Sequence, residues 1–239
     1  MLTVRIMDTD MHTTMTTSAT ALLHLLRLTS PALPVGAFAY SQGLEGAVSA
    51  GVVRDENRAR DWILGLLEHS VAQLDVPVLA RLHTAWSEDD WPGVERWSER
   101  LHASRETREL QEEDSALGRA LARLLISLGE PRAARLGSHP SVTWAASFAL
   151  AAVHAGITLT DTAHGYLFAG LENQVNAAVR LIPLGQTAGQ RILVSGIERI
   201  PGAVARGIAL LDDEIGAAAP GLALLSAGHE TQYARLFRS

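Results

Sequence analysis

The chain has 239 residues, of which 47% are hydrophobic and 19% charged, with a formal net charge of −6. This composition is that of a folded globular protein, long enough for one sizeable core or two small ones. It has no cysteine, and every basic residue is an arginine. Disulfides, thiolate metal sites and a P-loop lysine are therefore excluded. The arginines are scattered, which argues against nucleic-acid binding.

The N-terminal residues 1–17 are rich in methionine and threonine and lack a compact apolar stretch of the signal-peptide kind. We expect them to form a flexible tail. No later apolar stretch reaches the roughly 20 residues that a bilayer helix needs. The sequence therefore predicts no membrane segment and is compatible with a cytoplasmic location.

From residue 18 onward, apolar residues recur at helical spacing, and runs of alternating β-branched residues are missing. Thr17 or Ser18 is a plausible cap for the first helix, Asp55 for the third, and Gly51 is a normal helix end. The pattern predicts an all-α, single-domain bundle of about nine or ten helices over residues 18–228. The expected helices cover residues 18–28, 41–50, 55–74, 77–86, 90–103, 104–128, 142–155, 161–182, 185–196 and 201–213.

Three segments have a distinct character. Residues 129–141 hold two glycines and two prolines and are the best candidate for a hinge or long loop. The next helix, 142–155, is apolar nearly all round and should be buried. In helix 104–128, Arg105 is spaced i,i+4 from Glu109, and Arg108 from Glu112, which predicts a solvated charged face.

Two motifs suggest an enzyme. The segment Ala39–Gly43 is one residue away from the nucleophile elbow GxSxG, which makes a serine hydrolase built on Ser41 the less favoured alternative. That elbow needs a strand before the serine, whereas a proline-rich loop precedes Ser41, so we favour a helix-cap role. The segment beginning at His229 starts like the zinc motif HExxH, but Tyr233 replaces the second histidine. We expect no enzyme activity, no metal site and no tightly bound cofactor.

A polar stripe on helix 161–182, formed by Glu172, Asn176 and Arg180, needs partners if it is buried. An internal network and a subunit interface are equally compatible with it. Because the helices after Gly129 are rich in alanine and leucine, we also expect a homodimer that uses them.

Four segments taken together resemble one family, the urease accessory protein family UreF. They are SPALPVGAFAYSQGLE at 30–45, ASRETRELQEED at 103–114, LENQVNAAVRLIPLGQTAGQR at 171–191 and HETQYARLFRS at 229–239. The resemblance runs from about Leu22 to Ser239. Ala37 and Ala39 depart from it, because glycine and serine are expected there.

The resemblance implies a non-catalytic helical protein that bridges UreD, also called UreH, and the GTPase UreG while nickel is delivered to apo-urease. Nickel would be handled by the complex. An alternative role is regulation of the GTPase through an arginine that reaches the nucleotide, for which Arg105 and Arg191 are the candidates. The partner-binding residues that we expect from the four segments are Tyr40, Ser41, Gln42, Arg105, Glu106, Glu172, Asn176, Gln186, Arg191, Tyr233, Arg235, Leu236, Phe237 and Arg238.

The last segment, 229–239, is predicted to be a partner-binding tail. Chain ends are usually loose unless docked, so we expect it to be mobile in the free protein and to fold on UreD with Tyr233 and Phe237 as anchors. The alternative is that Leu236 and Phe237 pack on the chain's own bundle.

Overall fold

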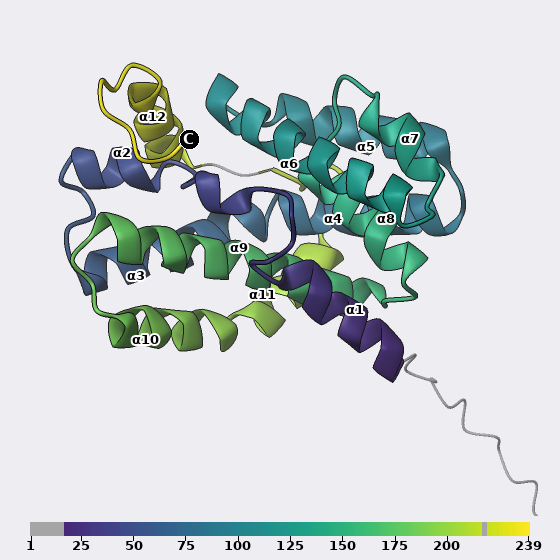
Figure 1. Ribbon diagram of the computed structural model, residues 1–239, viewed down its shortest axis with the longest axis horizontal. Coiled ribbons are helices and arrows are strands. Elements are labelled where there is room, and N and C mark those ends of the chain that lie inside the picture. Colours follow the sequence, from purple (N-terminus) through teal and green to yellow (C-terminus); the bar gives the residue numbers. More distant parts are fainter. Residues whose placement is uncertain (1–16, 217–218) are drawn as a thin grey trace, which may run out of the picture.

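The computed structural model describes residues 17–216 and 219–239, and every regular element within them is helical (Figure 1). The predicted all-α fold is confirmed. The described residues form twelve α-helices, and the two beyond the predicted set, α7 and α12, are short. Most of the predicted tail, residues 1–16, lies outside the described residues.

Ser18 and Asp55 cap α1 and α3 as predicted, because their side chains accept hydrogen bonds from the backbone N–H groups of Ala21 and Arg58. The helices are α1 (Ala19–Thr29), α2 (Leu44–Ser49), α3 (Glu56–Leu66), α4 (Asp75–Ser87), α5 (Trp91–Ala103), α6 (Arg108–Ser127), α7 (Arg132–Gly137), α8 (Trp144–His154), α9 (Leu159–Leu181), α10 (Gln186–Ile197), α11 (Ile200–Ala209) and α12 (Pro220–His229). A 3₁₀ turn, η1 (Ala37–Ala39), precedes α2, and a π-helical turn, η2 (Leu67–Val71), continues α3.

The apolar helix α8 is buried, as its composition predicts. All residues from Ala145 to Ala152 are buried, and α4 and α6 cover the helix on two sides. Its few polar contacts are satisfied: Trp86 Nε1 donates to the Ala146 carbonyl at 3.0 Å, and Ser147 Oγ donates to the Gly118 carbonyl at 2.8 Å. A helix that is apolar on all sides thus finds its cover within the chain itself.

The long helix α9 contacts helices from both halves of the sequence. It packs against α1, α4 and α11, and also against α2, α3 and α10 (Figure 1). The chain returns to α2 at its end, where α12 packs against α2 and α6. Segments from both ends of the sequence therefore meet beside α9.

The segment 129–141, predicted to be a hinge or long loop, contains the short helix α7. Ion pairs of Glu130 hold the start of this segment. Glu130 is buried and pairs with Arg132 at 2.8 Å and with His154 at 2.9 Å. The hydrogen bonds from Arg132 lower the pKa of Glu130 to about 2. The glycines and prolines of this segment keep α7 short, but the ion pairs of Glu130 hold the segment against the rest of the protein.

The predicted solvated face of α6 is wrong in part. Arg108 and Glu112 are exposed and pair at 3.5 Å, but Glu109, Glu113 and Asp114 are buried. The helix begins at Arg108, after the cap Thr107, so Arg105 lies outside it and takes other partners. The i,i+4 spacing of charges does not reveal that these carboxylates are buried, because their partners come from distant parts of the chain.

Within the described residues, no single helix is long and apolar enough to cross a membrane. The segments Glu56–Val71 and Asp75–Ser87 reach that length and composition only as a pair, which is bent by 46°. Much of this pair is buried in the bundle, including Ile63, Leu79 and Leu82.

Candidate partner-binding surface

Residues 230–239, called here the C-terminal segment, lie on the bundle in the structure. The Ser41 N–H donates to the Ser239 carbonyl at 3.0 Å, and the Arg238 N–H donates to the Ala39 carbonyl at 2.9 Å. Phe237 is buried, while Leu236 and Tyr233 are exposed. The structure thus shows the docked alternative for Phe237 in place of the mobile tail. The segment is not a separate unit, because its last residues pair with the loop that precedes α2.

Two buried carboxylates, those of Glu45 and Glu109, bind the C-terminal segment. Glu45 of α2 accepts the N–H of Leu236 at 2.7 Å and that of Phe237 at 2.9 Å. Glu109 of α6 accepts from the Arg235 guanidinium at 2.6 Å. Neither glutamate is among the residues predicted for the site. Their only signal in the sequence is that each lies within a segment of the family resemblance.

The Ser41 hydroxyl is a structural group at this junction. It is fully buried, accepts from the Glu45 N–H at 3.2 Å and donates to the carbonyl of Ser239. Helix α2 begins only at Leu44, after Gly43 in the left-handed region with φ 78°, so Ser41 lies just outside the expected cap position. The 3₁₀ turn η1 and not a strand precedes it, and within the described residues none of its hydrogen bonds is to a histidine. The arrangement lacks the parts of a hydrolase elbow.

The loop before α2 is tied to α9 by two residues that the predicted polar stripe does not include. Asn173 Nδ2 donates to the Tyr40 carbonyl at 3.1 Å, and Gln174 Nε2 donates to the Ser41 carbonyl at 2.7 Å. Gln42 in turn donates to Glu113 at 3.0 Å. The side chains next to Glu172 in sequence thus point at the loop, which fixes the shape of the surface.

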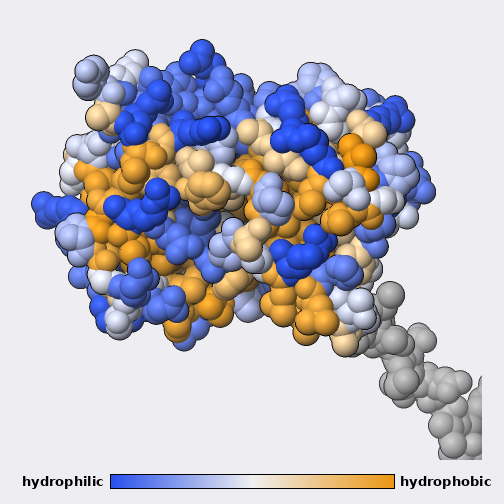
Figure 2. Space-filling view, viewed as in Figure 1, coloured by the Kyte–Doolittle hydropathy of each residue, from blue (hydrophilic) through white to orange (hydrophobic). Residues whose placement is uncertain are grey.

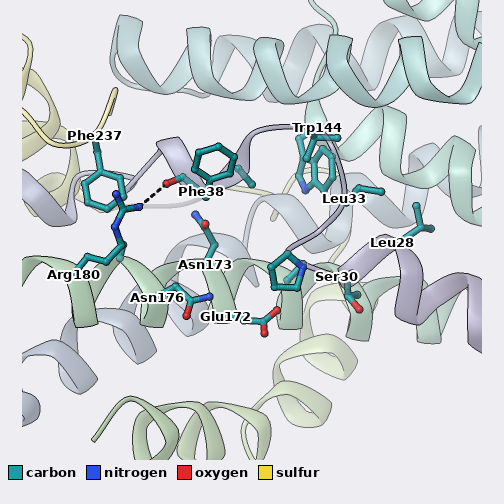
Figure 3. Close-up of a pocket in the computed structure, with 16 residues that line it drawn as sticks. Leu28, Ser30, Leu33, Phe38, Trp144, Glu172, Asn173, Asn176, Arg180 and Phe237 are labelled. Carbon is teal, nitrogen blue, oxygen red and sulfur yellow. Dashed lines mark hydrogen bonds between the residues drawn. The ribbon is translucent and has the colours of Figure 1, made fainter. Parts of the chain in front are cut away.

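A groove runs between this loop and α9 and ends at Phe237 (Figure 3). Arg180 closes that end: it donates to the Phe38 carbonyl at 3.1 Å, and its guanidinium lies 4.6 Å from the centre of the Phe237 ring. The lining residues labelled in Figure 3 are Leu28, Ser30, Leu33, Phe38, Trp144, Glu172, Asn173, Asn176, Arg180 and Phe237.

The polar stripe of α9 therefore faces the groove and not an internal network. Glu172 is half-buried, and this burial raises the pKa of its carboxyl group. Asn176 and Arg180 are exposed. Phe38, at the rim of the groove, leaves 70% of its surface exposed. Hydrophobic residues gather over the middle of this face and over α1 (Figure 2), which is the pattern of a surface that binds another protein.

The side chain of Arg105 is 18% exposed, does not line the groove and is occupied by two carboxylates. Its guanidinium pairs with Asp75 at 2.6 Å and with Asp114 at 3.1 Å, and Tyr166 donates to Asp75 at 2.9 Å. Burial raises the pKa of Asp114 and that of Tyr166. An arginine held by two buried carboxylates is not free to reach a bound nucleotide, so this geometry does not support the role of Arg105 as an arginine finger.

The remaining predicted residues do not join this surface. Arg191 of α10 forms an exposed pair with Glu56 of α3, with N–O distances of 2.8 and 2.6 Å, and Gln186 is exposed at the start of α10. Glu106 is exposed in the turn before α6. The fourteen predicted residues therefore fall into an outer surface, a buried network, two positions on α10 and Glu106 in the turn before α6.

Among residues 17–216 and 219–239, no group of three histidine or acidic side chains is arranged to hold a metal ion. The one buried histidine of the C-terminal part, His229, has a carboxylate oxygen at each ring nitrogen. What the surface offers is apolar side chains on a rigid frame, which is suited to binding another protein.

The sequence is similar to those of several known proteins. The family model UreF matches residues 53–195. A protein named urease accessory protein UreF from Alkalilimnicola ehrlichii is 51% identical over 215 residues, which are 90% of this chain and 94% of the relative. Its namesake from Teredinibacter turnerae is 49% identical over 218 residues, 91% and 98% of the two chains. Urease accessory protein UreF 2 from Brucella anthropi is 48% identical over 221 residues, 92% and 97% of the two chains.

These names describe accessory proteins and not enzymes, as the sequence predicts. Because the family model matches more than half of the chain and the relatives are covered almost throughout, this chain belongs to the UreF family of urease accessory proteins.

Proposed function

We propose that this chain bridges UreD (UreH) and the GTPase UreG while nickel is delivered to apo-urease, and that UreD binds the surface formed by the C-terminal segment and the loop before α2. One observation carries the choice of surface. The segment is fixed by buried carboxylates, yet Tyr233 is fully exposed and Leu236 is 56% exposed at its outer side. A rigid segment with exposed apolar side chains loses little conformational entropy when it binds.

Replacing Tyr233 and Leu236 together with alanine should weaken the capture of UreD at least about tenfold, because aromatic and large apolar anchors dominate binding energy. The fold should be unaffected, since neither side chain is buried. The measurement is the dissociation constant for purified UreD, together with the circular dichroism spectrum of the variant. Leu211→Ala is the matched control: Leu211 is 63% exposed on the segment between α11 and α12, and its loss should change binding little. If the double variant binds UreD with near-native affinity, the UreD site lies elsewhere on the protein.

Deleting residues 229–239 is the weaker experiment. Residues 229–239 include His229, Phe237 and Ser239, which are buried, and the deletion would leave the carboxylates of Glu45 and Glu109 without their partners. A truncated chain is therefore expected to lose stability as well as partner binding. Point substitutions at the exposed side chains separate the two effects.

We propose further that the chain holds no nickel tightly by itself and that the complex handles the metal. Titration of the purified protein with nickel in a calorimeter should show no stoichiometric site of sub-micromolar affinity. The absence of cysteine and the carboxylates at both ring nitrogens of His229 support this expectation. A stoichiometric heat signal at micromolar nickel would contradict it.

The homodimer expected through the helices after Gly129 remains a proposal, although α8 offers no free face for it. Helix α8 is covered by its own bundle. Large apolar side chains that stay exposed include Leu22, Leu23 and Leu26 of α1, which are 50%, 66% and 57% exposed, and Val194 and Ile197 of α10, which are 53% and 44% exposed. We therefore propose that the contact between copies uses the exposed apolar side chains of α10 and α1.

A further inference from the structure

The groove between α9 and the loop before α2 has two unlike walls (Figure 3). Phe38 and Trp144 lie on its apolar side, whereas Glu172, Asn173 and Asn176 of α9 form its polar side. The volume of the groove is about 90 Å³. Because an α-helix with its side chains is about 10–12 Å across, the groove can take single side chains of a partner but not a whole helix.

The Glu172 carboxylate has no counter-charge among the described residues. Half-burial raises its pKa, and neither an arginine nor a hydrogen-bond donor lowers that pKa again. Arg180 stands two helical turns further along α9, about 12 Å away at about 1.5 Å per residue, and donates to the Phe38 carbonyl. The groove therefore contains a partly desolvated negative charge that is not balanced within the described part of the chain.

The amides beside Glu172 extend this acceptor surface. Asn173 Nδ2 donates to the Tyr40 carbonyl at 3.1 Å, which orients the amide and leaves its oxygen as an acceptor. Asn176 is exposed one helical turn beyond Glu172. A group that is positively charged and donates several hydrogen bonds, an ammonium or a guanidinium, is complementary to this wall. The apolar wall across the groove is complementary to an apolar side chain next to that cation.

The groove is continuous with the surface proposed to bind UreD. Phe237 of the C-terminal segment lines the end of the groove, and Leu236, its neighbour in the chain, is exposed. Neighbouring Cα atoms are about 3.8 Å apart. A partner that packs on Leu236 therefore reaches the mouth of the groove.

We propose that the groove binds a segment of UreD in which a lysine or arginine pairs with Glu172 and a neighbouring apolar side chain packs on Phe38. The identity of the partner rests on the proposed function, whereas the chemistry of the bound segment follows from the charge and shape of the groove. In the free chain Glu172 lowers stability, since a partly buried charge without a partner is unfavourable. The complex supplies the counter-charge, so Glu172 contributes to binding and not to folding.

The first measurement uses the isolated chain. A carboxyl group whose pKa is raised by folding stabilises the folded form at low pH and destabilises it once ionised at neutral pH. Glu172→Gln keeps the size of the side chain and removes the charge, so its unfolding midpoint in urea at neutral pH should equal or exceed that of the wild type. A lower midpoint would show that the protein itself stabilises the Glu172 carboxylate, and the proposal would be overturned.

Binding to purified UreD should change in the opposite sense. Glu172→Gln should raise the dissociation constant about tenfold, because the charge of the pair is lost while one acceptor oxygen remains. Glu172→Arg should raise it about a hundredfold or more, because two like charges would then face each other. Phe38→Ala should raise it about tenfold by removing the apolar contact. Circular dichroism of each variant reports whether the fold is intact.

Glu99→Gln is the matched control. Glu99 is exposed on α5 and does not line the groove, so the substitution makes the same change in net charge at a different place. The dissociation constant for UreD should stay within about twofold of the wild-type value. Equal effects of Glu99→Gln and Glu172→Gln would show that net charge and not the groove determines binding, which would overturn the proposal.

The double variant at Tyr233 and Leu236 separates this proposal from the proposed function. If that variant loses UreD while Glu172→Gln binds UreD as the wild type does, the surface is correct but the groove holds no cation of UreD. If both variants bind like the wild type, UreD binds elsewhere and both proposals are wrong. If Glu172→Gln leaves UreD binding unchanged and lowers the mass of a dimer in light scattering, a second copy covers the groove, and this proposal is again overturned.

Discussion

Replacing Arg105 with alanine should lower the free energy of unfolding by about 3–5 kcal/mol, the cost of breaking a buried ion pair by removing one partner. Asp75 and Asp114 are both buried and would lose the guanidinium that compensates them. Chemical denaturation, with the unfolding midpoint and slope compared between the two proteins, gives the difference.

The control is Arg191→Ala. Arg191 also forms a close pair with a glutamate, but its side chain is 59% exposed, and such pairs contribute about 0–1 kcal/mol. The two variants also separate the roles considered for the arginines. If Arg105→Ala were as stable as Arg191→Ala, the buried network would not hold the fold, and a functional role of Arg105 would need renewed attention.

Adding one methyl group at Gly118 should destabilise the protein by about 1–3 kcal/mol, although alanine is the better helix former. A Cβ at this position of α6 would lie 2.6 Å from the Thr143 carbonyl oxygen and 2.7 Å from its carbon, which are backbone atoms at the start of α8. Backbone atoms cannot move away as the end of a flexible side chain can. Helices α6 and α8 would therefore have to separate. Thermal and chemical unfolding of Gly118→Ala measure the cost.

Gly170→Ala is the matched control. Gly170 is exposed in the interior of α9, and a Cβ there meets no atom within 4 Å. Alanine should therefore stabilise the protein by about 0.5–1 kcal/mol through helix propensity alone. Equal effects of the two substitutions would show that α6 and α8 do not approach as closely as described.

Much of the candidate site could be named from the sequence, but not its organisation. Phe237, Ser41 and Gln42 were predicted, and the structure places them around one junction, where Gln42 donates to Glu113, which Ser239 also contacts. Glu45, Glu109, Asn173 and Gln174 were not predicted. Their partners are more than 100 residues away along the chain, and no local spacing reports such a contact.

The sequence by itself determined the helices, because caps, breakers and apolar periodicity act within a few residues. Ser18, Asp55 and the apolar run of α8 are examples, and the four family segments determined the family. Only the tertiary structure decided which charges are buried. Glu109 and Glu112 look alike in a helical repeat, yet Glu109 is buried and pairs with Arg235 and His229, whereas Glu112 lies in solvent. The physical reason is that burial of a charge depends on partners brought by distant helices, and the same helices fold the last ten residues onto the bundle.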